Sequence, residues 1–298
     1  MNNSEYHTLA KTIEKIIIAE NFTNVNLHQS EEQMLKRLKT EIGLTSLLSF
    51  YEDTFCQTES KWFLRIKNEW NVQMLENQSY SETFLVQLLQ SDEIDLSFPS
   101  GLMGLLLSLT KENKKFKNPV VEDFLNQVTK LLLRKKMMPK ADWQQYAFFP
   151  EAFDADTWTS NNILSWTVGD LHIVKFLYRQ AAVNPNRNYE LIAENIGMYS
   201  ITRTREEQTE IRDSSFANGS TGLVVLYQAL YQETRHESYW KASKYWLEKT
   251  KRLLQQDLQN GFYEGKESQF LDGLAGVLFV MRALQQENLS PLLAYLAG

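Results

Sequence analysis

Residues 215–224 read Ser-Phe-Ala-Asn-Gly-Ser-Thr-Gly-Leu-Val, two glycines three positions apart followed by an apolar run. A glycine that leads into an apolar run occurs five times, at Gly43, Gly101, Gly169, Gly219 and Gly273. These glycines are 58, 68, 50 and 54 residues apart. Self-similarity at such an interval indicates an array of repeated structural units.

The chain between the glycines has the periodicity of helices. Apolar residues recur every three or four positions in Leu9–Ile18, Phe124–Leu133, Val168–Tyr178, Leu223–Tyr231, Trp240–Leu254 and Leu274–Leu284. Helical segments without a leading glycine, such as Val120–Leu133 and Trp240–Leu254, alternate with the glycine-led ones. We therefore interpret each repeat as an antiparallel pair of helices.

Glycine at a helix start has a physical purpose. It removes side chains from one face of the first turn, so that a neighbouring backbone can approach and the first N–H groups stay accessible. Helix pairs that cannot bury their apolar faces alone stack on one another. We expect an all-α fold, a single domain over residues 1–298 in which about five pairs form an α/α toroid; an open α-solenoid fits the same pattern.

Composition restricts the possible partners. The net charge of −6 argues against nucleic-acid binding, which needs clustered Lys and Arg. No stretch approaches the roughly 18 apolar residues of a membrane span, and no signal peptide is recognisable, so we expect a cytoplasmic protein. Cys56 is the single cysteine. The basic runs Lys111–Lys117 and Arg134–Lys140 fit either solvated charge or a docking patch for an acidic partner.

Three of the repeats carry further flanking residues. Ser165–Asp170 resembles the Trp-Cys-Tyr-Gly motif of lanthionine synthetase C-like (LanC-like) proteins, Ser215–Gly222 resembles their Cys-His-Gly-x-x-Gly motif, and Phe270–Gly276 resembles their Leu-Glu-Gly-Leu-Ala-Gly motif. The resemblance extends over the whole chain and is firmest from Tyr146 onward. It implies an α/α toroid, usually of seven helix pairs, and we expect the missing part of the ring between Lys111 and Tyr146.

The resemblance also implies which residues would hold zinc in an active cyclase. There the metal binds the thiol of a precursor peptide through two cysteines and a histidine, with a fourth position open for substrate. These ligand positions fall on Thr167, Ala217 and Asn218, which cannot replace thiolate and imidazole. A family arginine falls on Ile163, and a further family histidine belongs to a repeat that is not found. We expect no zinc and no other cofactor.

The remaining candidate residues surround these positions. The mouth of the toroid is expected to be lined by Trp166, Thr167, Asp170, Asn218 and Asp272, and the candidate pocket also includes Ile163, His172 and Gly219. His172 fits either a proton shuttle or a histidine with a structural hydrogen bond. Asp170 fits either a base or a complement to the N-terminus of its own helix. The loop acids Asp154 and Asp156 offer a different, glycosidase-like pair of carboxylates; no nucleotide-binding or serine-hydrolase motif is present.

Three functions remain open. The first is an inactive LanC-like protein that binds a modified precursor peptide, or a partner dehydratase or cyclase, during lanthipeptide biosynthesis. The second is a cyclase that forms lanthionine without a metal, because thiols add slowly to dehydroamino acids and a preorganised pocket could direct them. The third is an α-solenoid that serves as a protein-interaction module.

Overall fold

The computed structural model describes residues 93–99, 101–154, 162–183 and 187–285. Gly43, Cys56, Asp156 and the segment Leu9–Ile18 lie outside these residues. The described part is mostly helical, as expected. Its long helices are α5 (Leu102–Phe116), α6 (Pro119–Arg134), α7 (Asp170–Val183), α8 (Arg187–Thr202), α10 (Ser220–Thr234), α11 (Glu237–Gln259) and α12 (Leu274–Gln285).

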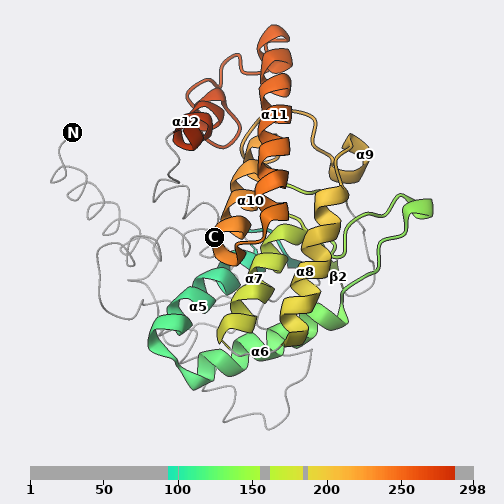
Figure 1. Cartoon of the computed structure of the whole chain (residues 1–298), viewed down its shortest axis with the longest axis vertical. Helices are drawn as coiled ribbons and strands as arrows, with labels where there is room; N and C mark the ends of the chain where they lie inside the picture. Colours follow the sequence, from blue (N-terminus) through green and yellow to red (C-terminus); the bar gives the residue numbers. More distant parts are fainter. Residues whose placement is uncertain (1–92, 100, 155–161, 184–186, 286–298) are drawn as a thin grey trace, which may run out of the picture.

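Successive helices form hairpins. α5 packs on α6, α7 on α8, and α10 on α11. The glycine-led helices also pack on one another, α5 on α7, α7 on α10 and α10 on α12. Figure 1 shows α7 between α5 and α8. The helices that begin after Gly101, Gly169, Gly219 and Gly273 therefore form a continuous inner row, with the returning helices beside it.

Burial separates the two kinds of helix. In α10 almost every residue from Ser220 to Leu230 is buried, which is typical of a helix surrounded on all sides. In α11 the buried residues recur at spacings of three and four, as in Tyr239, Ala242 and Trp246, while the other face is exposed. The sequence pattern thus predicts the helices, and burial identifies which of them lie inside.

Local signals fix several helix ends. The Asn118 side chain caps α6 by accepting the backbone N–H of Val120 at 3.0 Å, and Pro119 occupies the first turn, where its missing N–H costs nothing. Lys117 and Arg235 end α5 and α10 in the left-handed region, with φ of 48° and 60°.

The interval of 68 residues between Gly101 and Gly169 contains a complete hairpin. After α6 the chain runs through the short 3-10 helix η1 (Ala141–Trp143) and strand β2 (Ala152–Asp154). β2 pairs antiparallel with β1 (Glu93–Asp95), so the approaches to α5 and α7 lie side by side. A short helix α9 (Glu206–Thr209) precedes α10. The number of repeats, closure of the ring and the position of a missing pair stay predictions.

Candidate functional site at the glycine-motif loops

The loops that precede the inner helices are joined by backbone hydrogen bonds. The N–H of Phe98 donates to the carbonyl oxygen of Thr167 at 2.7 Å. In turn, the N–H of Thr167 donates to the carbonyl oxygen of Ala217 at 3.2 Å, and the N–H of Ala217 donates to the carbonyl oxygen of Leu271 at 2.9 Å. Thr167, Ala217 and Leu271 each stand two residues before the leading glycine of their repeat. The four loops therefore form one hydrogen-bonded row at the N-terminal ends of the inner helices.

An aromatic side chain accompanies each step of this row. Phe98, Trp166, Phe216 and Phe270 stand three residues before the leading glycines. The ring centroids are 5.4 Å apart between Phe98 and Trp166, 5.1 Å between Trp166 and Phe216, and 5.2 Å between Phe216 and Phe270. Our sequence reasoning missed this stripe, although an aromatic residue at a constant distance from each glycine was a visible signal. The rings fill the space beneath the loops.

The three positions that the resemblance assigns to zinc ligands come together in the row. The Thr167 hydroxyl donates a hydrogen bond to the Asn218 side-chain oxygen, across the two motif loops. It also lies 2.9 Å from the Ser165 hydroxyl. Ala217 is buried, Thr167 is half-buried and Asn218 is exposed. The positions that the resemblance selected thus meet in space.

The chemistry of this donor set does not fit zinc. A neutral hydroxyl, a carboxamide oxygen and a methyl group stand where zinc prefers thiolate and imidazole. The hydroxyl and carboxamide are moreover hydrogen-bonded to each other. Within the described ranges, no group of three His, Cys, Asp or Glu residues has the geometry to hold a metal ion.

His172 is buried in the wall of this site, with 1% of its surface exposed. Its Nε2 donates to the carbonyl oxygen of Trp166 at 2.6 Å, and its ring stacks on Phe98 with centroids 4.4 Å apart. Burial lowers the pKa of His172 to about 3, and the charge of Lys175 acts in the same direction, against the hydrogen bond to Trp166. A neutral, stacked imidazole supports the structural interpretation of His172.

The position of His172 explains why histidine is accommodated there. In the α10 and α12 repeats the fourth residue of the motif is Gly222 or Gly276, and a β-carbon on either would overlap a carbonyl oxygen of its own loop. In the α7 repeat His172 takes this place and donates to the corresponding carbonyl instead. The leading glycine of the α7 repeat also has a different backbone conformation. Gly169 has φ of +128°, which favours glycine, whereas Gly219 has φ of −100°.

Asp170 is completely buried in the first turn of α7 and is held by partners from other segments. Its carboxylate accepts the backbone N–H groups of Phe148 and Phe149 at 3.1 Å. It also forms an ion pair with Arg203 at 2.9 Å, in which both side chains have 0% exposure. Burial raises the pKa of Asp170, while the Arg203 charge and the two backbone N–H groups lower it. Asp170 therefore joins three segments, and substrate cannot reach it.

Arg203 completes this anchor with two further hydrogen bonds. Its Nε donates to the carbonyl oxygen of Gln208 at 2.9 Å, and its Nη2 donates to that of Asn162 at 2.6 Å. No motif or spacing in the sequence singles out Arg203, which follows the end of α8 and lies 33 residues from Asp170. The guanidinium holds the loop that leads to Thr167 in place.

The other predicted residues have varied positions. Ile163 is half-buried, and its carbonyl oxygen would lie 2.7 Å from a β-carbon on Gly169. Gly219 caps α10, and Asp272 is exposed in the loop before α12. Trp166 is buried, with 4% exposure. The Asp154–Asp156 pair lies beyond the described side chains and stays a hypothesis.

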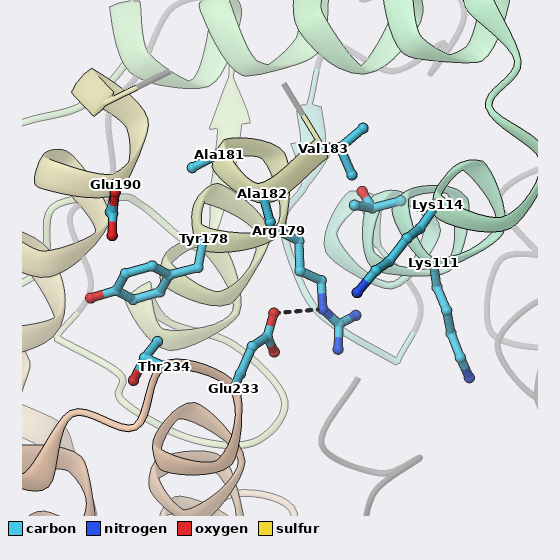
Figure 2. Close-up of a pocket in the computed structure, with 11 residues that line it drawn as sticks. Lys111, Lys114, Tyr178, Arg179, Ala181, Ala182, Val183, Glu190, Glu233 and Thr234 are labelled. Carbon is cyan, nitrogen blue, oxygen red and sulfur yellow. Dashed lines mark hydrogen bonds and ion pairs between the residues drawn. The ribbon is translucent and has the colours of Figure 1, made fainter. Parts of the chain in front are cut away.

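A separate cavity of about 520 Å³ lies at the other ends of the inner helices. Lys111 and Lys114 of α5, Arg179 of α7 and Glu233 of α10 contribute to its lining. Figure 2 shows Arg179 beside Glu233, to which its Nε is bonded at 3.1 Å. A helix of 14 residues is about 21 Å long, so this cavity is remote from the motif loops.

Comparisons with known proteins agree with this architecture. Residues 210–296 match the family described as lanthionine synthetase C-like protein. The structure is similar to that of nisin cyclase, with a TM-score of 0.60 and 15% sequence identity, over 86% of this chain. The chain spans 65% of the length of nisin cyclase. A search of curated proteins by sequence gives no match. The resemblance to LanC-like proteins and the toroid type of fold are thus confirmed.

Proposed function

We propose that this chain, LanC-like over residues 210–296 and similar in fold to nisin cyclase, is a zinc-free member of the family that binds rather than cyclises. Its ligand would be a modified precursor peptide, or a partner dehydratase or cyclase, in the cytoplasm. The observation that carries the proposal is the hydrogen bond between Thr167 and Asn218, at positions that the resemblance assigns to two zinc ligands.

This hydrogen bond is important because of the chemistry by which thioether rings form in the peptide. A cyclase of this family needs a metal to bind the peptide thiol, lower its pKa and present a thiolate. A threonine hydroxyl and an asparagine amide lack the affinity for zinc to do so. With these groups engaged by each other, the chain offers the peptide a polar contact surface without a Lewis acid.

The exposed residues of the loop row are suited to contact a peptide. Asn218 and Asp272 are exposed polar side chains, and Leu271 beside them is 41% exposed. The backbone bonds between Thr167, Ala217 and Leu271 fix the spacing of these groups. A surface ordered before binding loses little conformational entropy when a ligand docks.

The test compares the native chain with a variant in which the ligands are restored. We expect the purified native chain to contain no zinc above the buffer background after dialysis without chelator. The variant Thr167→Cys/Ala217→Cys/Asn218→His should bind about one zinc per chain, because the three positions already adjoin. Stoichiometric zinc in the native chain would refute the proposal.

Binding is tested separately with the peptides and enzymes encoded beside the chain. Titration calorimetry should detect a complex, and Asn218→Asp or Asp272→Asn should weaken it without altering the melting temperature, since both side chains are exposed. Absence of any complex with these partners would exclude the binding role.

The metal-free cyclase receives less support from the geometry. Asp170 and His172, its expected acid–base groups, have exposed fractions of 0% and 1% and are engaged in hydrogen bonds. Thioether formation from a dehydrated peptide should therefore proceed no faster with the chain than with peptide alone. A clear acceleration would favour this alternative over the binding role.

A further inference from the structure

Residues 134–146, from the last residue of α6 into the connection to β2, form an arm that projects from the helices (Figure 1). Lys140 and Gln145 pair in an antiparallel bridge, with N–H···O distances of 2.8 and 3.1 Å. The helix η1 forms the tip, and Gln144, in the left-handed region with φ of 53°, closes the turn. The arm is thus a hydrogen-bonded hairpin with a defined tip.

Hydrogen bonds fix the arm to the segment that leads into the Ser165–Asp170 motif and to the backbone of Phe148. The side-chain N–H of Asn162 donates to the carbonyl oxygen of Gln144 at 2.7 Å, and its oxygen accepts the N–H of Tyr146 at 2.8 Å. The N–H of Met137 donates to the carbonyl oxygen of Phe148 at 2.8 Å. The backbone of Phe148 is bound in turn by the buried Asp170. The tip is therefore held in position before it meets any partner.

The tip presents apolar and cationic side chains together. Trp143 and Met138 are 76% and 64% exposed, more than any other large hydrophobic residue in the described ranges. The ammonium of Lys140 lies 4.7 Å from the centroid of the Trp143 ring, and that of Lys136 lies 3.4 Å from the sulfur of Met138. Residues 134–146 contain four basic residues and one acidic residue, whereas the whole chain has a net charge of −6.

We propose that this arm docks the protein onto an anionic lipid surface, with Trp143 and Met138 entering the headgroup layer and the basic residues facing lipid phosphates. Tryptophan is enriched at membrane–water interfaces because its ring is apolar and its N–H is polar. Basic residues beside it are attracted by anionic headgroups. Because the rest of the chain is acidic, repulsion from the same surface orients the molecule with its arm toward the lipid.

The shape of the arm favours a lipid surface over a protein partner. A stable protein interface buries about 800 Å² on each side. The arm projects from the helices and offers two large exposed apolar side chains, Trp143 and Met138, so it suits insertion into a deformable layer. Among the described helices, none is long and apolar enough to cross a bilayer.

The experiment is co-sedimentation of the full chain with vesicles of phosphatidylcholine, with or without phosphatidylglycerol. Binding should require phosphatidylglycerol and fall as salt is raised. Trp143→Ser should weaken binding at least about tenfold, whereas Trp240→Ser should leave it unchanged. Trp240 is the matched control, because it is also exposed, at 39%, and has a lysine ammonium 5.5 Å from its ring.

A second pair of variants tests the charges. Lys136→Gln/Lys140→Gln should lower the affinity about fivefold for each lysine removed, and Lys241→Gln/Lys244→Gln on the exposed face of α11 should have little effect. Equal binding to both kinds of vesicle would overturn the proposal. Vesicle binding that Trp143→Ser leaves intact would also overturn the proposal. Binding of the arm to a protein partner, with no binding to either kind of vesicle, would overturn it as well.

Discussion

Acidification should destabilise this protein through one residue, His172. The imidazole is neutral in the fold because it is buried against Phe98 and donates to the carbonyl oxygen of Trp166. Its pKa is lowered from 6.5 to about 3. Between these two values the unfolded chain binds a proton that the folded chain excludes, so stability is fully present above pH 6.5 and is lost as the pH falls toward 3.

Over much of this pH range, the size of the stability loss depends only on the pKa of the histidine in the unfolded chain. At a pH of about 4.5, two units below the unfolded pKa, the loss for one histidine is about 3 kcal/mol relative to pH 7.5, and it changes little so long as the folded pKa lies well below 4.5. Such a loss is a large share of the 5–15 kcal/mol that is typical of whole proteins.

Urea unfolding at several pH values, followed by circular dichroism, measures this effect. His172→Gln retains an N–H donor for the Trp166 carbonyl but does not titrate, so the difference between the native and variant curves isolates the imidazole. His236→Gln, at a side chain that is 38% exposed, controls for the loss of a histidine. If the native and His172→Gln stabilities declined in parallel from pH 7.5 to 4.5, the reasoning about burial at this position would be wrong.

Two further variants test the scaffold of the site by the same unfolding assay. Arg203→Met should lower the free energy of unfolding by about 3–5 kcal/mol, because it leaves the carboxylate of Asp170 buried without its counter-charge. The control Arg212→Met removes an ion pair with Glu206 whose side chains are 75% and 61% exposed, and it should lower that free energy by less than about 1 kcal/mol. Equal losses for the two variants would contradict the role assigned to Arg203. Gly222→Ala should destabilise the protein by about 1–3 kcal/mol, although alanine is the better helix former. The reason is that its β-carbon would overlap the Phe216 carbonyl oxygen and press on the Trp166 side chain. An increase in stability would contradict the close approach of this loop to the helix.

The helices and the meeting of the two central motifs could be predicted from the sequence. Periodicity located α10 and α12 after Gly219 and Gly273, because buried faces leave a local signature. The resemblance to LanC-like motifs implied that Thr167 lies near Asn218, which agrees with the way equivalent loops of neighbouring units adjoin. Both inferences depend on information that lies within one repeat or is shared by all of them.

The residues that sequence reasoning missed depend on contacts between distant segments. Arg203 reaches Asp170 from the end of α8, and no spacing rule connects a helix start with the residue that follows the next helix. The same limit applies to Asp170, whose partners Phe148 and Phe149 come from an irregular connection. The basic run Arg134–Lys140 was visible as charge, but its combination with Trp143 depends on the bridge between Lys140 and Gln145.

The backbone row through Thr167, Ala217 and Leu271 separates the groups that hold the repeats together from the side chains that could carry chemistry. Each link uses an N–H and a carbonyl, groups that every residue except proline supplies. A hydroxyl, a methyl and an isobutyl side chain consequently occupy equivalent places without breaking a link. A scaffold of this kind can exchange its chemistry one side chain at a time during evolution, because losing a reactive group there does not entail losing the fold.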